Sequence, residues 1–168
     1  PAEQFAKGAL SAARLAPTSA TFSKVEKEFK DNIVYTPQDS SSFLVGVNID
    51  RQTYNHTAKS SDAQKASTKK ALMNKDFRQA LSFAFDRTAY ASQVNGKEGA
   101  TKMLRNLYIP PTFVQADGKS FGELVKEKVA SYGDEWKDVN FDDAQDGLYN
   151  KEKAKAEFAK AKKALQEE

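Results

Sequence analysis

The sequence predicts an α/β fold that is rich in helices and poor in strands. Several segments carry apolar residues at the three- and four-residue spacing of an amphipathic helix. Two capping boxes, SDAQ at residues 61–64 and SFGE at residues 120–123, indicate helix starts. One segment, FLVGVNI at residues 43–49, alternates as a β-strand does. Because helices outnumber strands more than in a complete α/β domain, we expect further sheet strands outside this chain.

The first thirty residues predict two helices with a break between them. Residues 2–10 read as a short helix, and Pro-Thr at 17–18 interrupts the pattern. A second helix fits from Ser19, and Asp-Asn at 31–32 can end it. The apolar faces comprise Phe5, Ala9 and Leu10 in the first helix and Phe22, Val25 and Phe29 in the second.

Two strands are predicted next, and we expect them to pair as a hairpin. The first is IVYT at residues 33–36, just before Pro37, and the second is residues 43–49, with a loop at residues 39–42 between them. Alternation places Phe43, Val45, Val47 and Ile49 on one face and Leu44, Gly46 and Asn48 on the other. Asn48 therefore lies on the less apolar face of a strand that we expect to be buried.

The middle of the chain predicts three consecutive helices after a polar loop at residues 51–61. Ser61 caps a Lys-rich helix that runs to about Met73, and residues 74–85 form the next helix. Asp86 can close that helix and cap the third, which Gly96 stops. The apolar face of residues 74–85 comprises Phe77, Ala80, Leu81, Ala84 and Phe85, and we expect it to pack through Phe77, Leu81 and Phe85.

The last third predicts two helices separated by loops. LRNLYIPPTF at residues 104–113 reads as a loop because its two prolines forbid a central strand. A helix follows Ser120 and ends before Gly133, residues 134–150 read as an acidic loop, and Asn150 caps a last helix. The expected inward residues are Leu124, Val125, Val129 and Tyr132, and then Ala154, Phe158, Ala161 and Leu165.

Composition argues against several classes of protein. The chain has 168 residues, a net charge of +3 and no cysteine, which excludes disulfides and thiolate metal sites. No apolar run approaches the roughly 20 residues of a membrane helix. A Lys-rich nucleic-acid-binding module is the alternative reading, but only five of the 26 basic residues are Arg, and Lys alternates with Glu and Ala as on a solvated helix face.

The motifs for catalysis and metal binding are incomplete. DDAQDG resembles the start of an EF-hand, but its third position is Ala144 and its twelfth is Lys153, so a solvated acidic turn is favoured. His56 is the only histidine and lies in a polar loop without partners for zinc. No nucleophile–base pair or Gly-rich phosphate loop is visible, so the sequence predicts neither an enzyme nor a cofactor.

Two features could face a ligand. Aromatic residues and prolines gather in NLYIPPTF, which is either a loop held on the core by Leu107, Ile109 and Phe113 or a ligand-facing loop. Asn48 carries an amide that must be hydrogen-bonded if it is buried, either to the structure or to a ligand.

NKDFRQALSFAFDR, residues 74–87, resembles the pattern [DN]-x-x-[VF]-R-x-A-[IL]-x-x-A-[IF]-D-R of extracytoplasmic peptide-binding proteins that supply ABC importers. FLVGVNIDRQTYN upstream and VNG, PPTF and YNKEKAKAEFAKAKKAL downstream follow the order of that family. YTPQDS, DRTAYASQVNG and DAQDGLYN are similar to the Ami/Ali type of oligopeptide-binding lipoproteins from Gram-positive bacteria. The resemblance extends from about Phe5 to Glu168.

The resemblance implies a receptor without catalysis that captures oligopeptides for a membrane permease. It implies a periplasmic-binding-protein type II-like fold with two lobes, of which residues 1–168 are a helix-rich part of the C-terminal-side lobe. The parent protein would be extracellular and tethered to the membrane by lipid, and we expect this chain to be a piece of it. The implied ligand-binding residues are Asn48, Tyr108, Pro110 and Thr112, with no cofactor or metal, whereas Arg78 and Asp86 are assigned structural roles.

Overall fold

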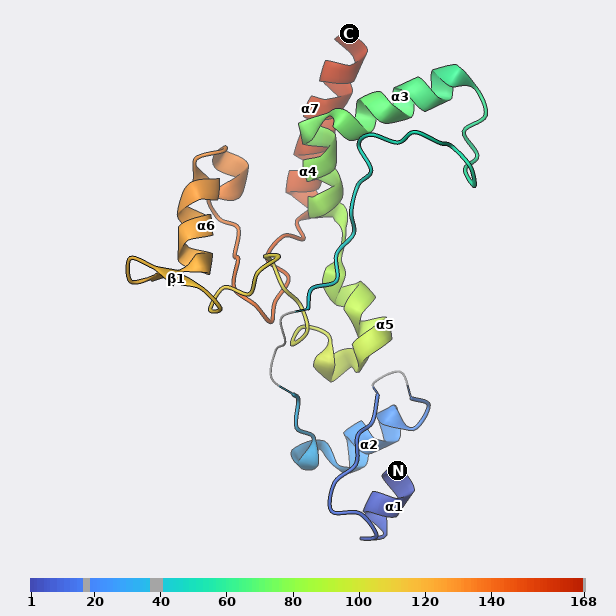
Figure 1. The fold of residues 1–168 in the computed structure, drawn as a ribbon, viewed down its shortest axis with the longest axis vertical. Coiled ribbons are helices and arrows are strands. Elements are labelled where there is room, and N and C mark those ends of the chain that lie inside the picture. Colours follow the sequence, from blue (N-terminus) through green and yellow to red (C-terminus); the bar gives the residue numbers. More distant parts are fainter. Residues whose placement is uncertain (17–18, 37–40, 168) are drawn as a thin grey trace.

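The computed structural model describes residues 1–16, 19–36 and 41–167. The predicted break at residues 17–18 and the first half of the predicted loop at residues 39–42 lie outside the described residues. The described chain is mostly helical, and its N-terminal helices lie at the end of the long axis opposite the C-terminus (Figure 1). The elements are α1 (Ala2–Ala6), α2 (Phe22–Glu28), η1 (Lys30–Asn32), α3 (Asp62–Met73), α4 (Lys75–Ala84), α5 (Arg87–Gly99), β1 (Gln115–Ala116), β2 (Lys119–Ser120), α6 (Phe121–Ala130), η2 (Asp134–Trp136) and α7 (Lys151–Glu167).

Among the described helices, α4 and α7 make the most extensive contact. The main core lies where α4 ends and α7 begins. Phe83 of α4 is completely buried and lies 5.3 Å from the Trp136 ring, centroid to centroid. The backbone N–H of Asn150 donates to the Phe83 carbonyl at 2.9 Å, so the end of α4 is joined to the start of α7. The core comprises Phe83, Val139, Phe141 and Ala154, with Leu107, Val129, Trp136 and Leu148 packed against it.

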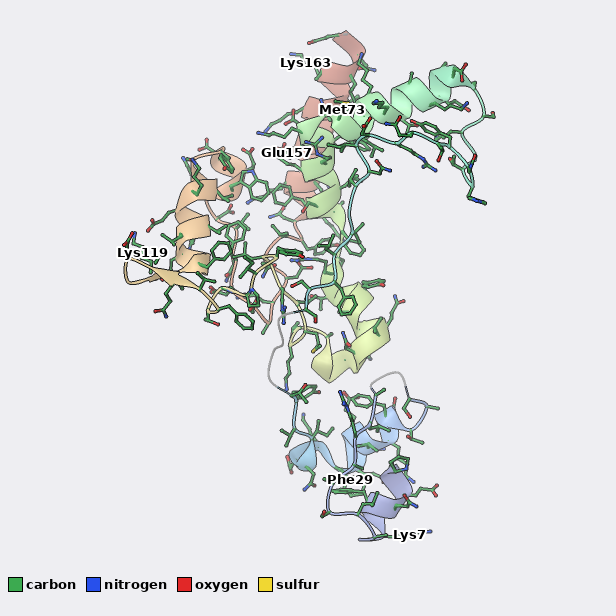
Figure 2. The ribbon with its side chains drawn as sticks, in the orientation of Figure 1. Lys7, Phe29, Met73, Lys119, Glu157 and Lys163 are labelled. Atoms are coloured by element: carbon green, nitrogen blue, oxygen red, sulfur yellow. The ribbon has the colours of Figure 1, made fainter. Side chains whose placement is uncertain are left out.

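A buried carboxylate lies farther along the α4–α7 contact. Figure 2 labels Glu157 where α7 runs beside α4. The residue is only 1% exposed, and its carboxylate accepts hydrogen bonds from Gln79 at 3.0 Å and Lys160 at 2.6 Å. On α7, Ala154 and Ala161 are buried as predicted, whereas Phe158 is exposed. Glu157 takes part in the buried face because Gln79 offers a polar partner across it.

The predicted starts of α3, α4, α5 and α6 are confirmed by capping hydrogen bonds. Ser61 and Ser120 each form a complete capping box with the side chain three residues on. The Asn74 side chain accepts from Phe77 N at 2.9 Å, and Asp86 accepts from Ala89 N at 2.8 Å. These side chains satisfy N–H groups that a helix cannot pair internally.

Arg78 and Asp86 have the structural roles that the sequence analysis gave them. Arg78 donates to the Leu72 carbonyl at 2.8 Å and so closes the C-terminal end of α3 onto α4. Asp86 is the last residue between α4 and α5, and its side chain caps the start of α5. Gly96, the predicted stop, has φ of +72° and kinks the helix, which then continues to Gly99.

The predicted packing face of α4 is wrong in part. The side turned to α7 carries Gln79, Ala80 and Phe83, whereas Leu81 is 45% exposed and Phe85 is also exposed. Phe77 is half-buried, as expected, near the Phe158 ring. The helix has apolar residues on two sides, and periodicity alone does not say which side α7 covers.

The predicted hairpin of residues 33–36 with 43–49 is also wrong. In the described chain neither segment is a strand, and the side chains of residues 43–49 are exposed, with Phe43 fully so. The alternation is present, but a strand also needs a neighbouring strand to pair its backbone groups. Residues 43–49 run as an extended segment beside the helical body without such a neighbour among the described residues (Figure 1).

Three smaller differences concern local structure. The first helix ends at Ala6 rather than Leu10, and Gly8 follows with φ of +72°. The segment 134–150, predicted as an acidic loop, contains a 3-10 turn and contributes Val139 and Phe141 to the core. A short hairpin, β1–β2, has a two-residue turn at Asp117-Gly118, a dipeptide typical of such turns, and it is not among the predicted elements.

No helix in the described part of the chain is both long enough and apolar enough to span a bilayer.

We predict that Phe83→Ala lowers the free energy of unfolding by about 3–5 kcal/mol, because it removes a completely buried aromatic ring from the core. Leu81→Ala, on the exposed side of the same helix, should change it by only about 0.5 kcal/mol. Urea unfolding followed by circular dichroism measures both. Equal losses for the two variants would contradict the assignment of the buried face.

Candidate ligand-binding site

Three side chains from distant parts of the sequence form a polar hub: Arg87, Asn106 and Asp146. Arg87 begins α5, and its guanidinium donates to Asp146 Oδ1 through Nε at 3.1 Å and through Nη2 at 2.5 Å. Its backbone N–H donates to Asp146 Oδ2 at 2.8 Å. The two side chains are 18% and 7% exposed, so this is a largely desolvated ion pair with both carboxylate oxygens satisfied.

Asn106 joins the hub to two further backbone segments. Its Oδ1 accepts from Arg87 Nη2 at 2.5 Å and from Gly147 N at 3.0 Å. Its Nδ2 donates to the carbonyls of Asp142 at 2.5 Å and Gln145 at 2.9 Å. The buried amide is therefore fully paired, as a buried polar group must be. It fixes the loop that contains it against the turn at residues 142–147.

The charge of Asp146 is stabilised by its donors. Burial would raise the pKa of its carboxyl group, but hydrogen bonds from the Arg87 side chain and from the backbone N–H of Tyr149 outweigh that effect. The pKa of Asp146 is therefore lowered from the ordinary aspartate value. The hub therefore favours the ionised form of Asp146.

Gly147 is required by a close approach of two backbone segments. A Cβ atom at this position would lie 1.6 Å from the Asn140 carbonyl oxygen, which no side chain can occupy. The absence of a side chain allows the 142–147 turn to fold back on residue 140 and to present its N–H to Asn106.

The aromatic loop, residues 104–113, rises from this hub. Pro110 and Pro111 are buried, and Pro111 packs against Gly122 at the start of α6. Tyr108 is 72% exposed, and Thr112 is also exposed. A rigid base with a projecting tyrosine and hydroxyl is an arrangement that suits ligand contact, because the base limits the entropy lost on binding.

The extended segment, residues 41–49, is attached to the aromatic loop at its beginning. Arg105 Nη1 donates to the Ser41 carbonyl at 2.6 Å and to Ser42 Oγ at 3.1 Å. Ser42 Oγ in turn donates to the Tyr108 carbonyl at 2.8 Å. Segments more than sixty residues apart in sequence thus lie side by side at this point.

The predicted site residues fall in two places. Tyr108, Pro110 and Thr112 share the aromatic loop, whereas Asn48 lies at the far end of the extended segment. Asn48 is exposed rather than buried, so that expectation is wrong, and its Oδ1 accepts from Asp50 N at 3.2 Å. It lines a shallow surface hollow with Asp50, Arg51, Gln52 and Thr53.

The polar hub is not among the features predicted from the sequence. Arg87 appears there only within the family pattern, and Asp146 is expected in a solvated turn, whereas both side chains are largely buried. The Asp-Gly dipeptide at 146–147 was the available signal, since such a pair indicates a tight turn that can bury its acid. Asp146 is committed to Arg87, and the residues that the structure describes contain no group of three acidic or histidine side chains placed to hold a metal ion.

No family model matches the chain. Whole-length similarity instead relates it to curated oligopeptide-binding proteins of streptococci, so the resemblance found in the sequence is confirmed over all 168 residues. Over all 168 residues, the chain is 98% identical to the oligopeptide-binding protein SarA of Streptococcus gordonii, and it covers 25% of the length of that protein. It is 73% identical to the oligopeptide-binding protein AliA of Streptococcus pneumoniae and covers 26% of that protein. Over 162 residues it is 60% identical to AmiA of the same species and covers 25% of it. The chain therefore spans about a quarter of the length of the curated relatives that it matches.

We predict that Asp146→Asn destabilises the chain at pH 7 and that the difference shrinks in acid. A carboxyl whose pKa is lowered on folding stabilises the folded state above its unfolded pKa, about 3.9, and loses that contribution as pH falls through the folded pKa. The free energy of unfolding of the unsubstituted chain should therefore fall more steeply below about pH 4 than that of Asp146→Asn.

Asp117→Asn serves as the control for this measurement. Asp117 is exposed in the β1–β2 turn, where its backbone φ of +51° suits Asn as well as Asp. Urea titrations at a series of pH values measure all three proteins. Parallel curves for Asp146→Asn and the unsubstituted chain would contradict the assigned role of the ion pair.

Proposed function

We propose that this chain is part of one lobe of an extracellular oligopeptide-binding receptor that captures peptides for an ABC importer. The observation that carries the proposal is similarity over the whole chain to several oligopeptide-binding proteins, at 98% identity for one of them. The role is binding rather than catalysis. The receptor would present its peptide to a membrane permease and would be held at the cell surface by a lipid anchor.

The extended segment supports the reading as part of a lobe. Its alternating apolar residues are exposed on both sides, which is unfavourable unless another part of the protein covers them. The relatives are about four times as long as this chain, so they contain residues that could supply neighbouring strands. A helix-rich piece of a periplasmic-binding-protein type II-like lobe, the C-terminal-side lobe, accounts for the many helices and for the exposed extended segment.

The proposed peptide contacts are Asn48, Tyr108, Pro110 and Thr112. An exposed tyrosine offers a broad apolar face and one hydroxyl at a small cost in side-chain entropy, which suits ligands of varied sequence. The amide of Asn48 and the hydroxyl of Thr112 can pair with peptide main-chain groups directly or through water. Pro110 contributes by fixing the loop, since its side chain is buried.

Nucleic-acid binding is less well supported. Several lysines are already paired with acidic neighbours, among them Lys155 with Glu152 and Lys160 with Glu157. These pairs offset part of the positive charge of α7. A steep loss of DNA or RNA affinity with added salt would favour the nucleic-acid reading.

We predict that Tyr108→Ala in the full-length receptor weakens peptide binding about tenfold without changing the thermal midpoint, because the exposed ring contacts ligand and not core. Tyr132→Ala removes a comparably exposed tyrosine from the end of α6 and should leave affinity unchanged. Calorimetric titration with a randomised hexapeptide pool measures both. Equal affinities for the two variants would count against the site.

We also predict that the 168-residue chain alone binds peptides far more weakly than the full-length receptor. A ligand enclosed between two lobes makes hydrogen bonds to both, and each 1.4 kcal/mol that is lost reduces affinity about tenfold. The same titration on the isolated chain, with circular dichroism to verify helices, provides the test. Affinity near that of the receptor would refute the two-lobed interpretation.

A further inference from the structure

Arg105 forms a bridge between the two segments that carry the proposed peptide contacts. Its Nη1 atom donates to Ser41 and Ser42 in the extended segment, while its own backbone belongs to the aromatic loop. The Ser42 hydroxyl in turn donates a hydrogen bond to the carbonyl of Tyr108 in the aromatic loop. The Arg105 guanidinium and the Ser42 hydroxyl therefore hold the two segments close together at this point.

The loop side of this bridge is held firmly. Arg87 donates to the Arg105 carbonyl at 2.8 Å, and Asn106 lies in the polar hub with all of its amide groups paired. The backbone that carries the Arg105 side chain thus starts from a position fixed by a desolvated ion pair. The Arg105 guanidinium can therefore position the two serines that accept its hydrogen bonds.

The segment side is otherwise loosely held. For residues 43–49 the structure records no backbone–backbone hydrogen bond to any other described residue. Within the described segment, the hydrogen bonds recorded to other parts of the chain involve Ser41 and Ser42. The next recorded side-chain link is the exposed ion pair of Asp50 with Lys69 at 3.2 Å. Among the described residues, the bridge therefore joins the segment that carries Asn48 to the aromatic loop.

We propose that Arg105 is a positioning residue for peptide binding: it sets the spacing between the extended segment, with Asn48, and the aromatic loop, with Tyr108. This inference rests on the proposed function. Arg105 itself does not contact peptide. It lowers the entropy that the two segments would otherwise lose when a peptide brings them together.

Lysine should replace Arg105 more successfully than alanine does. The Arg105 contacts with Ser41 and Ser42 both come from one nitrogen, Nη1. A lysine ammonium has three donors on one nitrogen and can serve a carbonyl and a hydroxyl together. Partial rescue by Arg105→Lys is therefore a specific expectation of a positioning role.

The first arm of the experiment measures the spacing without any peptide. The chain has no cysteine, so Val45→Cys and Thr112→Cys, both at exposed positions, accept a pair of spin labels without further changes. Pulsed electron resonance then gives the distribution of label–label distances. We expect Arg105→Ala to broaden the distribution, Arg105→Lys to restore much of its width, and Arg14→Ala, which removes the same charge at an exposed position outside both segments, to leave it unchanged.

The second arm measures affinity in the full-length receptor with a randomised hexapeptide pool. Arg105→Ala should weaken binding about tenfold, with Arg105→Lys intermediate and Arg14→Ala unchanged. Tyr108→Ala combined with Arg105→Ala should weaken binding less than the product of the single effects, because the bridge acts through the position of Tyr108. Thermal midpoints of all variants separate positioning from general loss of stability.

The outcomes separate this inference from the proposed function. If Tyr108→Ala weakens binding while Arg105→Ala leaves both distance distribution and affinity unchanged, the positioning role is overturned and the peptide site stands. A broadened distribution with unchanged affinity reduces the bridge to a structural contact and also overturns the inference. If the unsubstituted receptor binds no peptide, the proposed function fails, and the positioning role fails with it.

Discussion

The charged pair of Arg87 and Asp146 is the interaction on which the arrangement of the candidate site depends. It joins the start of α5 to the turn that precedes α7, and through Asn106 it holds the base of the aromatic loop. Taking two charges out of water is unfavourable unless every donor and acceptor finds a partner. Here the carboxylate receives donors from the guanidinium and from three backbone N–H groups, which offsets that cost. Because the pair closes contacts between remote segments, it fixes how those segments are placed relative to one another.

Local features of the fold were predictable because their causes are local. The capping residues Ser61, Asp86 and Ser120 act on N–H groups within three residues, so the sequence alone contains the whole interaction. The starts of α3, α5 and α6 follow from them. The peptide-family resemblance was likewise readable from ordered motifs and agrees with the whole-chain similarity.

Features that depend on distant partners were not predictable. Residues 43–49 have the alternation of a strand, but strand formation depends on a neighbour that periodicity cannot reveal. The choice between Phe83 and Leu81 as the buried side of α4 depends on where α7 lies. The polar hub was missed for the same reason, since Arg87 and Asp146 are 59 residues apart. Among the predicted site residues, the three of the aromatic loop lie together by sequence proximity, whereas Asn48 is placed by long-range structure.

The buried Glu157 has a consequence for how α7 aligns with α4. The other buried side chains of α7 are small, Ala154 and Ala161, and by themselves they do little to oppose a shift along the helix axis. Such a shift would move the carboxylate away from Gln79 and leave it desolvated without that donor. The hydrogen bond between Gln79 and Glu157 thus helps to set the register of the helix pair, much as a lone asparagine does in a coiled coil.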